Sequence, residues 1–269
     1  MGFYLGYGLD SDTLIEILTA VTPHTSNSIV KSQFRTLAMV LLLQLKHAEE
    51  DFRRISLYLK ALGALMLIQD PTIWETIYAL QCVNAFLSYV DHPLLKIRKV
   101  VIDILSSLLQ NHSKKNAKQL RSYIGAFCKE VLKSSTRSEY KRSVFILQLL
   151  ETSMTFLLPA DSVEIAELAM KLQNCDQPVL TAAAFRMLDS FFQHFSFSLS
   201  TEQSLHTLKT LALMGIDSPD MEANVFFYTS LGSLFIQCFK LHQEKTLLIL
   251  PSIVEVTIFS LLGCFLLKT

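Results

Sequence analysis

One segment of the sequence is rich in side chains that could do chemistry, a run of basic residues in the middle of the chain. Between residues 96 and 142 there are 12 basic residues against three acidic ones. The basic residues are Lys96, Arg98, Lys99, Lys114, Lys115, Lys118, Arg121, Lys129, Lys133, Arg137, Lys141 and Arg142. Side chains of one sign at this density can bind the phosphates of a nucleic acid or an acidic protein partner. A solvated helix face gives the same pattern, so the charge count leaves both interpretations open.

Motifs of catalysis, cofactor binding and metal binding are missing from the sequence. It contains no Gly-Lys-Ser/Thr phosphate loop, no His-Glu-x-x-His, no Cys-x-x-Cys pair and no Gly-x-Ser-x-Gly. The seven histidines are too far apart for a metal pair on one helix, and loop or capping roles suit them better. The five cysteines are widely spaced, which is typical of a reduced, intracellular chain. We therefore expect a protein that is not an enzyme and that holds no cofactor and no metal.

A recurring turn indicates the elements that must position the basic residues. The pattern Asp-x-Pro occurs at residues 91–93, 176–178 and 217–219, and polar breaks fall near residues 51 and 134. These positions follow one another at roughly 40 to 43 residues, the period of HEAT and armadillo helix pairs. In each turn the Asp can cap the next helix, and the Pro can occupy an early helical position. The sequence thus predicts an all-α fold, a HEAT/armadillo-like helical solenoid of stacked antiparallel helix pairs that forms a single domain over residues 1–269.

The spacing of apolar residues predicts the individual helices. They cover a short segment before Pro23 and then residues 28–46, 51–69, 71–90, 93–110, 117–133, 139–158, 162–173, 178–195, 201–214 and 219–241, with a polar loop over 111–116. The hydrophobic fraction of 51% fits stacked repeats, because inner helices are covered on two sides. Trp74 is expected in the core, and Arg98 is expected to pair with a turn aspartate of an adjacent repeat.

The last apolar run, residues 246–267, allows two interpretations. Its 22 residues are long enough to span a bilayer and contain one charge, Glu255. A carboxylate near the middle of a span costs about 3 kcal/mol, which weighs against a membrane helix. The other interpretation is a buried helix pair over 245–250 and 252–267, broken at Pro251.

Several short stretches resemble one known family. They comprise Leu62-Gly63-Ala64-Leu65, Gln69-Asp70, Trp74, His92-Pro93 and Lys96-Ile97-Arg98-Lys99, and the likeness continues through residues 127–132 and 177–183. The most specific part is the cluster His92-Pro93 and Lys96-Ile97-Arg98-Lys99, which follows the tryptophan-bearing helix. Over residues 50–250 the chain resembles the HEAT-repeat region of the ribosomal RNA-processing protein twelve family. It resembles a fragment, because members of that family are several times longer.

The resemblance implies a nuclear and nucleolar assembly factor without catalytic residues. Such a factor accompanies pre-ribosomal particles, assists pre-rRNA processing and supports subunit maturation and export, in contact with pre-rRNA and with assembly or transport proteins. The basic residues between 96 and 142 are then the expected surface for a nucleic acid or an acidic partner. Two rivals remain at this point, a general protein-binding solenoid adaptor of the nuclear transport type and a helical protein anchored in a membrane through residues 246–267.

Overall fold

The computed structural model describes residues 11–48, 51–135, 140–172, 177–194, 201–214, 220–251 and 253–255. Within these ranges the chain forms helices and short connections and contains no strand, so the all-α prediction is confirmed. The chain divides into two compact units, residues 1–121 and 122–269, and the boundary falls inside helix α6 (Lys118–Lys133). The single domain over residues 1–269 stays a prediction.

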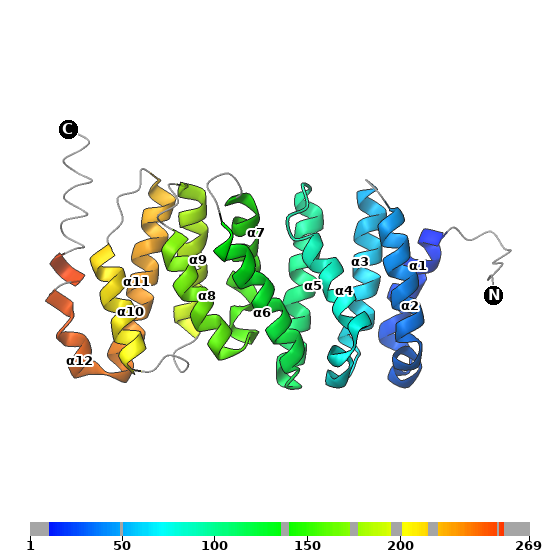
Figure 1. The fold of residues 1–269 in the computed structure, drawn as a ribbon, viewed down its shortest axis with the longest axis horizontal. Coiled ribbons are helices and arrows are strands. Elements are labelled where there is room, and N and C mark those ends of the chain that lie inside the picture. Colours follow the sequence, from blue (N-terminus) through cyan, green and yellow to red (C-terminus); the bar gives the residue numbers. More distant parts are fainter. Residues whose placement is uncertain are drawn as a thin grey trace. The chain divides into compact units, whose positions relative to one another are not determined.

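The first unit contains the helices α1 to α5 and the start of α6. Their bounds are α1 (Ser11–Val21), α2 (Asn27–His47), α3 (Phe52–Leu67), α4 (Ile77–Ser88) and α5 (Leu95–Lys114), with the 3-10 helices η1 (Thr22–His24) and η2 (Pro71–Glu75) before α2 and α4. Helices α1, α3 and α5 pack in one row, while α2 packs against both α3 and α4 (Figure 1). The unit is therefore a stack of helix pairs.

The second unit contains most of α6 and all later helices. Their bounds are α7 (Tyr140–Ser153), η3 (Met154–Phe156), α8 (Pro159–Lys171), α9 (Pro178–His194), α10 (Thr201–Met214), α11 (Met221–Leu241) and α12 (Gln243–Leu247). Helices α7, α9 and α11 pack consecutively, with α8 against α9 and α10 against α11 (Figure 1). The helices predicted to begin near residues 139, 178 and 219 thus lie side by side, as the HEAT-type stacking requires.

Hydrogen bonds join equivalent helices of successive repeats at a regular distance in sequence. In the first unit, Nδ2 of Asn111 in α5 donates to the carbonyl oxygen of Leu67 at the end of α3 (3.0 Å). In the second unit, Oγ of Ser233 in α11 donates to Oδ1 of Asp189 in α9 (2.5 Å). Both pairs are 44 residues apart. The packing of the helices therefore repeats with nearly the period that the turns predict.

A buried aromatic pair anchors the C-terminal end of α5 in the first unit. Trp74 and His112 are both fully buried, and their rings meet edge to face with centroids 4.9 Å apart. Nε2 of His112 lies 3.2 Å from the carbonyl oxygen of Met66 in the last turn of α3. Burial lowers the pKa of His112 to about 4, because the charged imidazolium is desolvated there. The neutral imidazole therefore donates to Met66 and caps α3, and the core position of Trp74 is confirmed.

Most helix ends lie within three residues of the predictions, and three larger differences stand out. Residues 71–90 form η2 and α4 rather than one helix, because Thr76 between them has an extended backbone (φ −92°, ψ 139°). Residues 139–158 likewise contain both α7 and η3. The predicted loop over 111–116 is helical up to Lys114, because Asn111 and His112 find acceptors on α3.

The caps follow the predicted chemistry only in part. Oδ1 of Asp51 accepts hydrogen bonds from the backbone N–H groups of Arg53 (3.0 Å) and Arg54 (3.2 Å) in the first turn of α3, and α9 begins at Pro178 as predicted. Helix α5 begins later than predicted, with Leu94 at the N-cap position. The backbone N–H of Leu94 donates to Nδ1 of His92 (3.1 Å), so the turn is closed by the histidine. The Asp-x-Pro turns at 176–178 and 217–219 lie wholly or partly outside the described residues.

The predicted membrane segment over 246–267 is described only at residues 246–251 and 253–255. These residues contain the end of α12 and a short further stretch of helix. Among the described helices, none has both the length and the hydropathy that crossing a bilayer requires.

Candidate nucleic-acid interface

One face of α5 carries lysines at both ends of the helix. Residues 96, 99, 103, 107, 110 and 114 follow one another at steps of three and four, so they share a face, and all of them are exposed. Lys96 and Lys99 lie in the first turns, and Lys114 is the last residue of the helix. At a rise of 1.5 Å per residue, Lys96 and Lys114 are about 27 Å apart along the axis. The face has one carboxylate, Asp103, so its net charge is positive.

The turn after α5 and the start of α6 add two more exposed lysines, Lys115 and Lys118. Between them Asn116 adopts a left-handed backbone (φ 59°), which asparagine tolerates better than most residues. We call Lys96, Lys99, Lys114, Lys115 and Lys118 the exposed lysine set. None of the five forms an ion pair with a residue that the structure describes. Their charges are therefore available to an external anion.

Arg98 stabilises the turn before its own helix. Its Nη1 donates to the carbonyl oxygens of His92 (2.7 Å) and Pro93 (2.8 Å). The guanidinium thus folds back over the turn, in a half-buried position. Pairing of Arg98 with an aspartate of an adjacent repeat stays a prediction.

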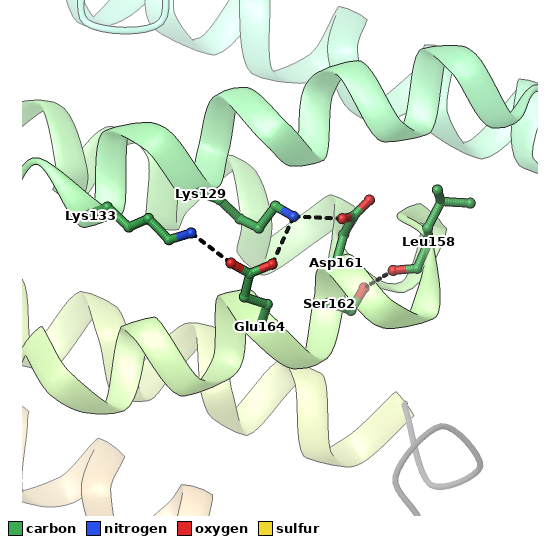
Figure 2. A network of polar contacts seen from close by, with 6 residues as sticks. All are labelled: Lys129, Lys133, Leu158, Asp161, Ser162 and Glu164. Atoms are coloured by element: carbon green, nitrogen blue, oxygen red, sulfur yellow. Dashed lines mark hydrogen bonds and ion pairs between the residues drawn. The ribbon is translucent and has the colours of Figure 1, made fainter.

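The predicted basic residues of the second unit have a different environment. Nζ of Lys129 in α6 lies 2.8 Å from Oδ1 of Asp161 and 2.8 Å from Oε2 of Glu164, both in α8. Nζ of Lys133 lies 2.7 Å from Oε1 of the same glutamate. Figure 2 shows Glu164 held between the two lysines, with Asp161 beside Lys129. The two lysines therefore neutralise carboxylates of the neighbouring helix.

Burial strengthens the inner part of this network. The side chains of Lys129 and Asp161 are only 19% and 14% exposed, whereas those of Lys133 and Glu164 are 56% and 41% exposed. Hydrogen bonds from Lys129 and then Lys133 lower the pKa of Glu164 to about 2. The bond to Asp161, followed by the bond to Glu164, raises the pKa of Lys129. Glu164 and Lys129 are thereby held in their charged forms at neutral pH.

A glycine permits the close approach of α6 to Asp161. A methyl group on Gly125 would lie 2.9 Å from Oδ2 and 3.1 Å from Cγ of Asp161, closer than carbon and oxygen atoms pack. Ser162 fixes the start of α8, because its Oγ donates to the carbonyl oxygen of Leu158 (3.2 Å; Figure 2) and to that of Met154 (3.1 Å). The backbone of α6 and α8 thus fixes the position of the Asp161 carboxylate that pairs with Lys129.

The remaining predicted residues lie near the start of α7 and in α6. Lys141 and Arg142 are exposed in the first turn of α7, and the guanidinium of Arg142 lies 5.5 Å from the ring centroid of Phe127. Arg121 is half-buried in the first turns of α6. Arg137 lies outside the described residues.

The sequence reasoning missed two cations that lie near Lys96. Arg53 and Lys60 of α3 line the same groove as Lys96 of α5. The repeat distance of 44 residues could have found them, because it places residues 52–60 level with residues 96–104. Elsewhere, no group of three His, Cys, Asp or Glu side chains within the described ranges could hold a metal ion.

The comparisons with known proteins agree with the fold and with the resemblance in sequence. The family described as RRP12-like, N-terminal HEAT repeats matches residues 10–198, which is well over half of the chain. No curated protein matches the sequence. The family match covers helices of both units, including α5, α6 and the ion-pair network of α8. The chain therefore belongs to the family of RRP12-like proteins with N-terminal HEAT repeats, whose role lies broadly in ribosome biogenesis.

Proposed function

We propose that this chain is a non-enzymatic HEAT-repeat scaffold that assists pre-rRNA processing and the maturation or export of pre-ribosomal subunits. Its family supports the pre-ribosomal setting and a place in the nucleus and nucleolus. The observation that carries the RNA contact is the exposed lysine set, whose five ammonium groups have no carboxylate partner among the described residues. Lys129 and Lys133 contribute less, because each already pairs with α8.

The mechanism is neutralisation of phosphates by side chains that a stiff helix holds apart. Lys96 and Lys114 are about 27 Å apart along α5, a length that several nucleotides of RNA can follow. Contacts to phosphate fix the position of an RNA without reading its sequence, so selectivity comes from shape and from protein partners. Binding then depends steeply on salt, because counterions are released.

The test compares two variants that lose the same charge. In the first, the exposed lysine set is replaced by Gln. In the control, five exposed lysines elsewhere are replaced by Gln, namely Lys46, Lys171, Lys209, Lys240 and Lys245. We expect the first variant to bind RNA more weakly and with a flatter salt dependence, since each phosphate contact contributes ~0.7 to 0.9 to the slope of log K against log salt. Equal losses of RNA affinity in both variants would mean that binding depends on the net charge of the chain and not on these five lysines.

The pre-ribosomal role is tested in cells with a tagged chain. Purification of the tagged protein is expected to recover pre-rRNA together with assembly factors, and a fluorescent fusion is expected in the nucleolus. Recovery of transport receptors with no pre-rRNA would instead favour the general adaptor.

A further inference from the structure

A groove lies between α3 and α5 in the first unit. It has a volume of about 360 Å³ and is lined from three helices, including Glu16 of α1, Phe52 of α3 and Val100 of α5. This volume is at the lower end of the range that ligand pockets occupy. The groove belongs to the row of helices α1, α3 and α5. On α3 and α5 it lies beside the N-terminal part of each helix.

The walls of the groove are mostly apolar, with Ser56 as an uncharged polar residue among them. Leu57, Ile97 and Val100 line it, and Ile97 is fully buried, so its side chain closes the groove toward the core. Phe52, the first residue of α3, also lines the groove and is 50% exposed. A large apolar side chain from outside could replace water on these surfaces, and burial of such a side chain is favourable.

The rim of the groove is basic. Arg53, Lys60 and Lys96 line it, against one carboxylate. That carboxylate, Glu16, lies 3.5 Å from Nη2 of Arg53, so the two charges offset each other. Lys60 and Lys96 are exposed on either side and form no ion pair within the part of the chain that the structure describes. The rim therefore carries two uncompensated positive charges beside an apolar groove.

We propose that this groove binds an acidic peptide segment of a partner protein, with one large apolar side chain inserted between α3 and α5. Carboxylates that flank the inserted side chain pair with Lys60 and Lys96, and the apolar side chain packs on Leu57, Val100 and Phe52. Such insertion into a groove beside charged residues is a general way in which helical surfaces recognise peptides. The proposal goes beyond RNA binding and does not depend on it.

The aliphatic lining favours a peptide over RNA. Leu57, Ile97 and Val100 offer no hydrogen-bonding groups to the edge of a base, and Ser56 is the one uncharged polar side chain among the described lining residues. Surfaces that bind single-stranded RNA stack successive bases on a series of aromatic rings, whereas only Phe52 among the described lining residues has one. A groove with an apolar wall and a basic rim matches a peptide that alternates carboxylates with a bulky apolar residue.

The experiment uses the full chain and synthetic probes. The first probe is a fluorescein-labelled peptide with one central phenylalanine and four glutamates on each side. The second has alanine at the centre, and the third is labelled polyuridine of similar length. We expect the phenylalanine peptide to bind about tenfold or more tightly than the alanine peptide, in line with the burial of one aromatic side chain. This comparison changes only the peptide, so it does not depend on the folding of a variant.

Protein variants then locate the site. Lys60→Gln and Lys96→Gln are each expected to weaken the phenylalanine peptide by about threefold to tenfold, and Phe52→Ala is expected to remove the preference for phenylalanine. Lys46→Gln, at an exposed lysine of α2 that does not line the groove, is the charge-matched control. Lys99→Gln distinguishes the two surfaces, because Lys99 lies on the exposed face of α5 but does not line the groove. The Lys99→Gln variant should bind polyuridine more weakly and bind the peptide as tightly as the wild type does.

Two outcomes would overturn the peptide site. They are equal binding of both peptides, and equal effects of Lys96→Gln and Lys99→Gln on peptide binding. The second result would assign peptide binding to the exposed lysine set. If Lys99→Gln weakens polyuridine binding and leaves peptide binding unchanged, the result supports an RNA surface that is distinct from the peptide groove.

Discussion

The two halves of the basic segment use their lysines in opposite ways. In the first unit, α5 is fixed to α3 by neutral groups, since Asn111 and His112 bond to backbone carbonyls and His112 packs on Trp74. In the second unit, α6 is fixed to α8 by charge, through Lys129. The lysines of α5 are therefore exposed and form no ion pair with a described residue, whereas Lys129 and Lys133 are paired. The difference separates the part of the segment that we propose for binding from the part that stabilises the fold.

The largest effect that we expect concerns the neutral anchor of the first unit. The pKa of His112 is lowered from 6.5 to about 4. Between these values the unfolded chain binds more protons than the folded chain, so the free energy of unfolding should fall by roughly 2 to 3 kcal/mol as pH drops from 6.5 to 4. His112→Gln should lack this fall. Fluorescence of Trp74, the single tryptophan, follows urea unfolding of this unit across the pH series.

A parallel pH dependence in wild type and the His112→Gln variant would contradict a buried neutral imidazole. A control at His47, which is exposed at the end of α2, removes one histidine without touching the anchor. His47→Gln should keep the wild-type dependence. If both variants flatten the curve, the titration belongs to the chain as a whole and the anchor of α5 does not depend on His112.

The second largest effect concerns the charged anchor of the second unit. Lys129→Met should leave Asp161, whose side chain is 14% exposed, without its cation. We expect a loss of about 2 kcal/mol in the free energy of unfolding, below the value for a fully buried pair because water reaches part of the site. The matched variant Lys99→Met removes an exposed lysine of α5 and should change the free energy by no more than about 0.5 kcal/mol. Urea unfolding followed by circular dichroism compares the two, and equal losses would erase the distinction between the halves.

The third prediction tests the close approach that places Asp161 beside Lys129. Gly232 in α11 has open space around it, so Gly232→Ala should stabilise the chain by about 0.5 to 1 kcal/mol through helix propensity. Gly125→Ala gains the same propensity but pushes against Asp161, and we expect a net loss of about 1 kcal/mol. Thermal unfolding of both variants gives the sign. A stabilised Gly125→Ala variant would mean that α8 moves away without cost.

The architecture was largely predictable from the sequence because its signals are local. Turns and apolar spacing fixed most helices within a few residues, and α10 was predicted at its observed bounds, Thr201–Met214. One error arose where a distant partner decides the local structure. Polar residues 111–116 predicted a loop, yet Asn111 and His112 are helical because the end of α3 accepts their hydrogen bonds. No local pattern contains the carbonyl of a helix 44 residues earlier.

The candidate site was predictable only as a set of charges. Counting residues between 96 and 142 treats Lys129 and Lys99 alike. Their difference comes from Asp161 and Glu164, which lie more than 30 residues after Lys129 in sequence and on the neighbouring helix. The same limit applies to Lys60, which lines a groove with Lys96 although 36 residues separate them. Once the repeat distance is known, residues that are about one repeat apart in sequence can be predicted to be neighbours in space.

The smallest effect that we expect concerns the outer part of the ion-pair network. The pKa of Glu164 is about 2 in the folded chain against an ordinary 4.5. Its ionised form therefore stabilises the fold above pH 4.5, and this stabilisation is lost as pH falls toward 2. The difference in free energy of unfolding between wild type and Glu164→Gln should be constant near neutral pH and shrink below pH 4.5. Circular dichroism with urea measures it.

The effect should be small because the pair is partly in water. The side chains of Glu164 and Lys133 are 41% and 56% exposed, so solvent and salt screen their attraction. Glu167→Gln, an exposed glutamate of the same helix, is the matched control and should show no such pH dependence. Added salt should reduce the Glu164 difference more than the loss caused by Lys129→Met, because Asp161 is better shielded from ions. If salt reduces both losses equally, the inner ion pair is as exposed to solvent as the outer one, and the charged anchor of α6 is only a surface contact.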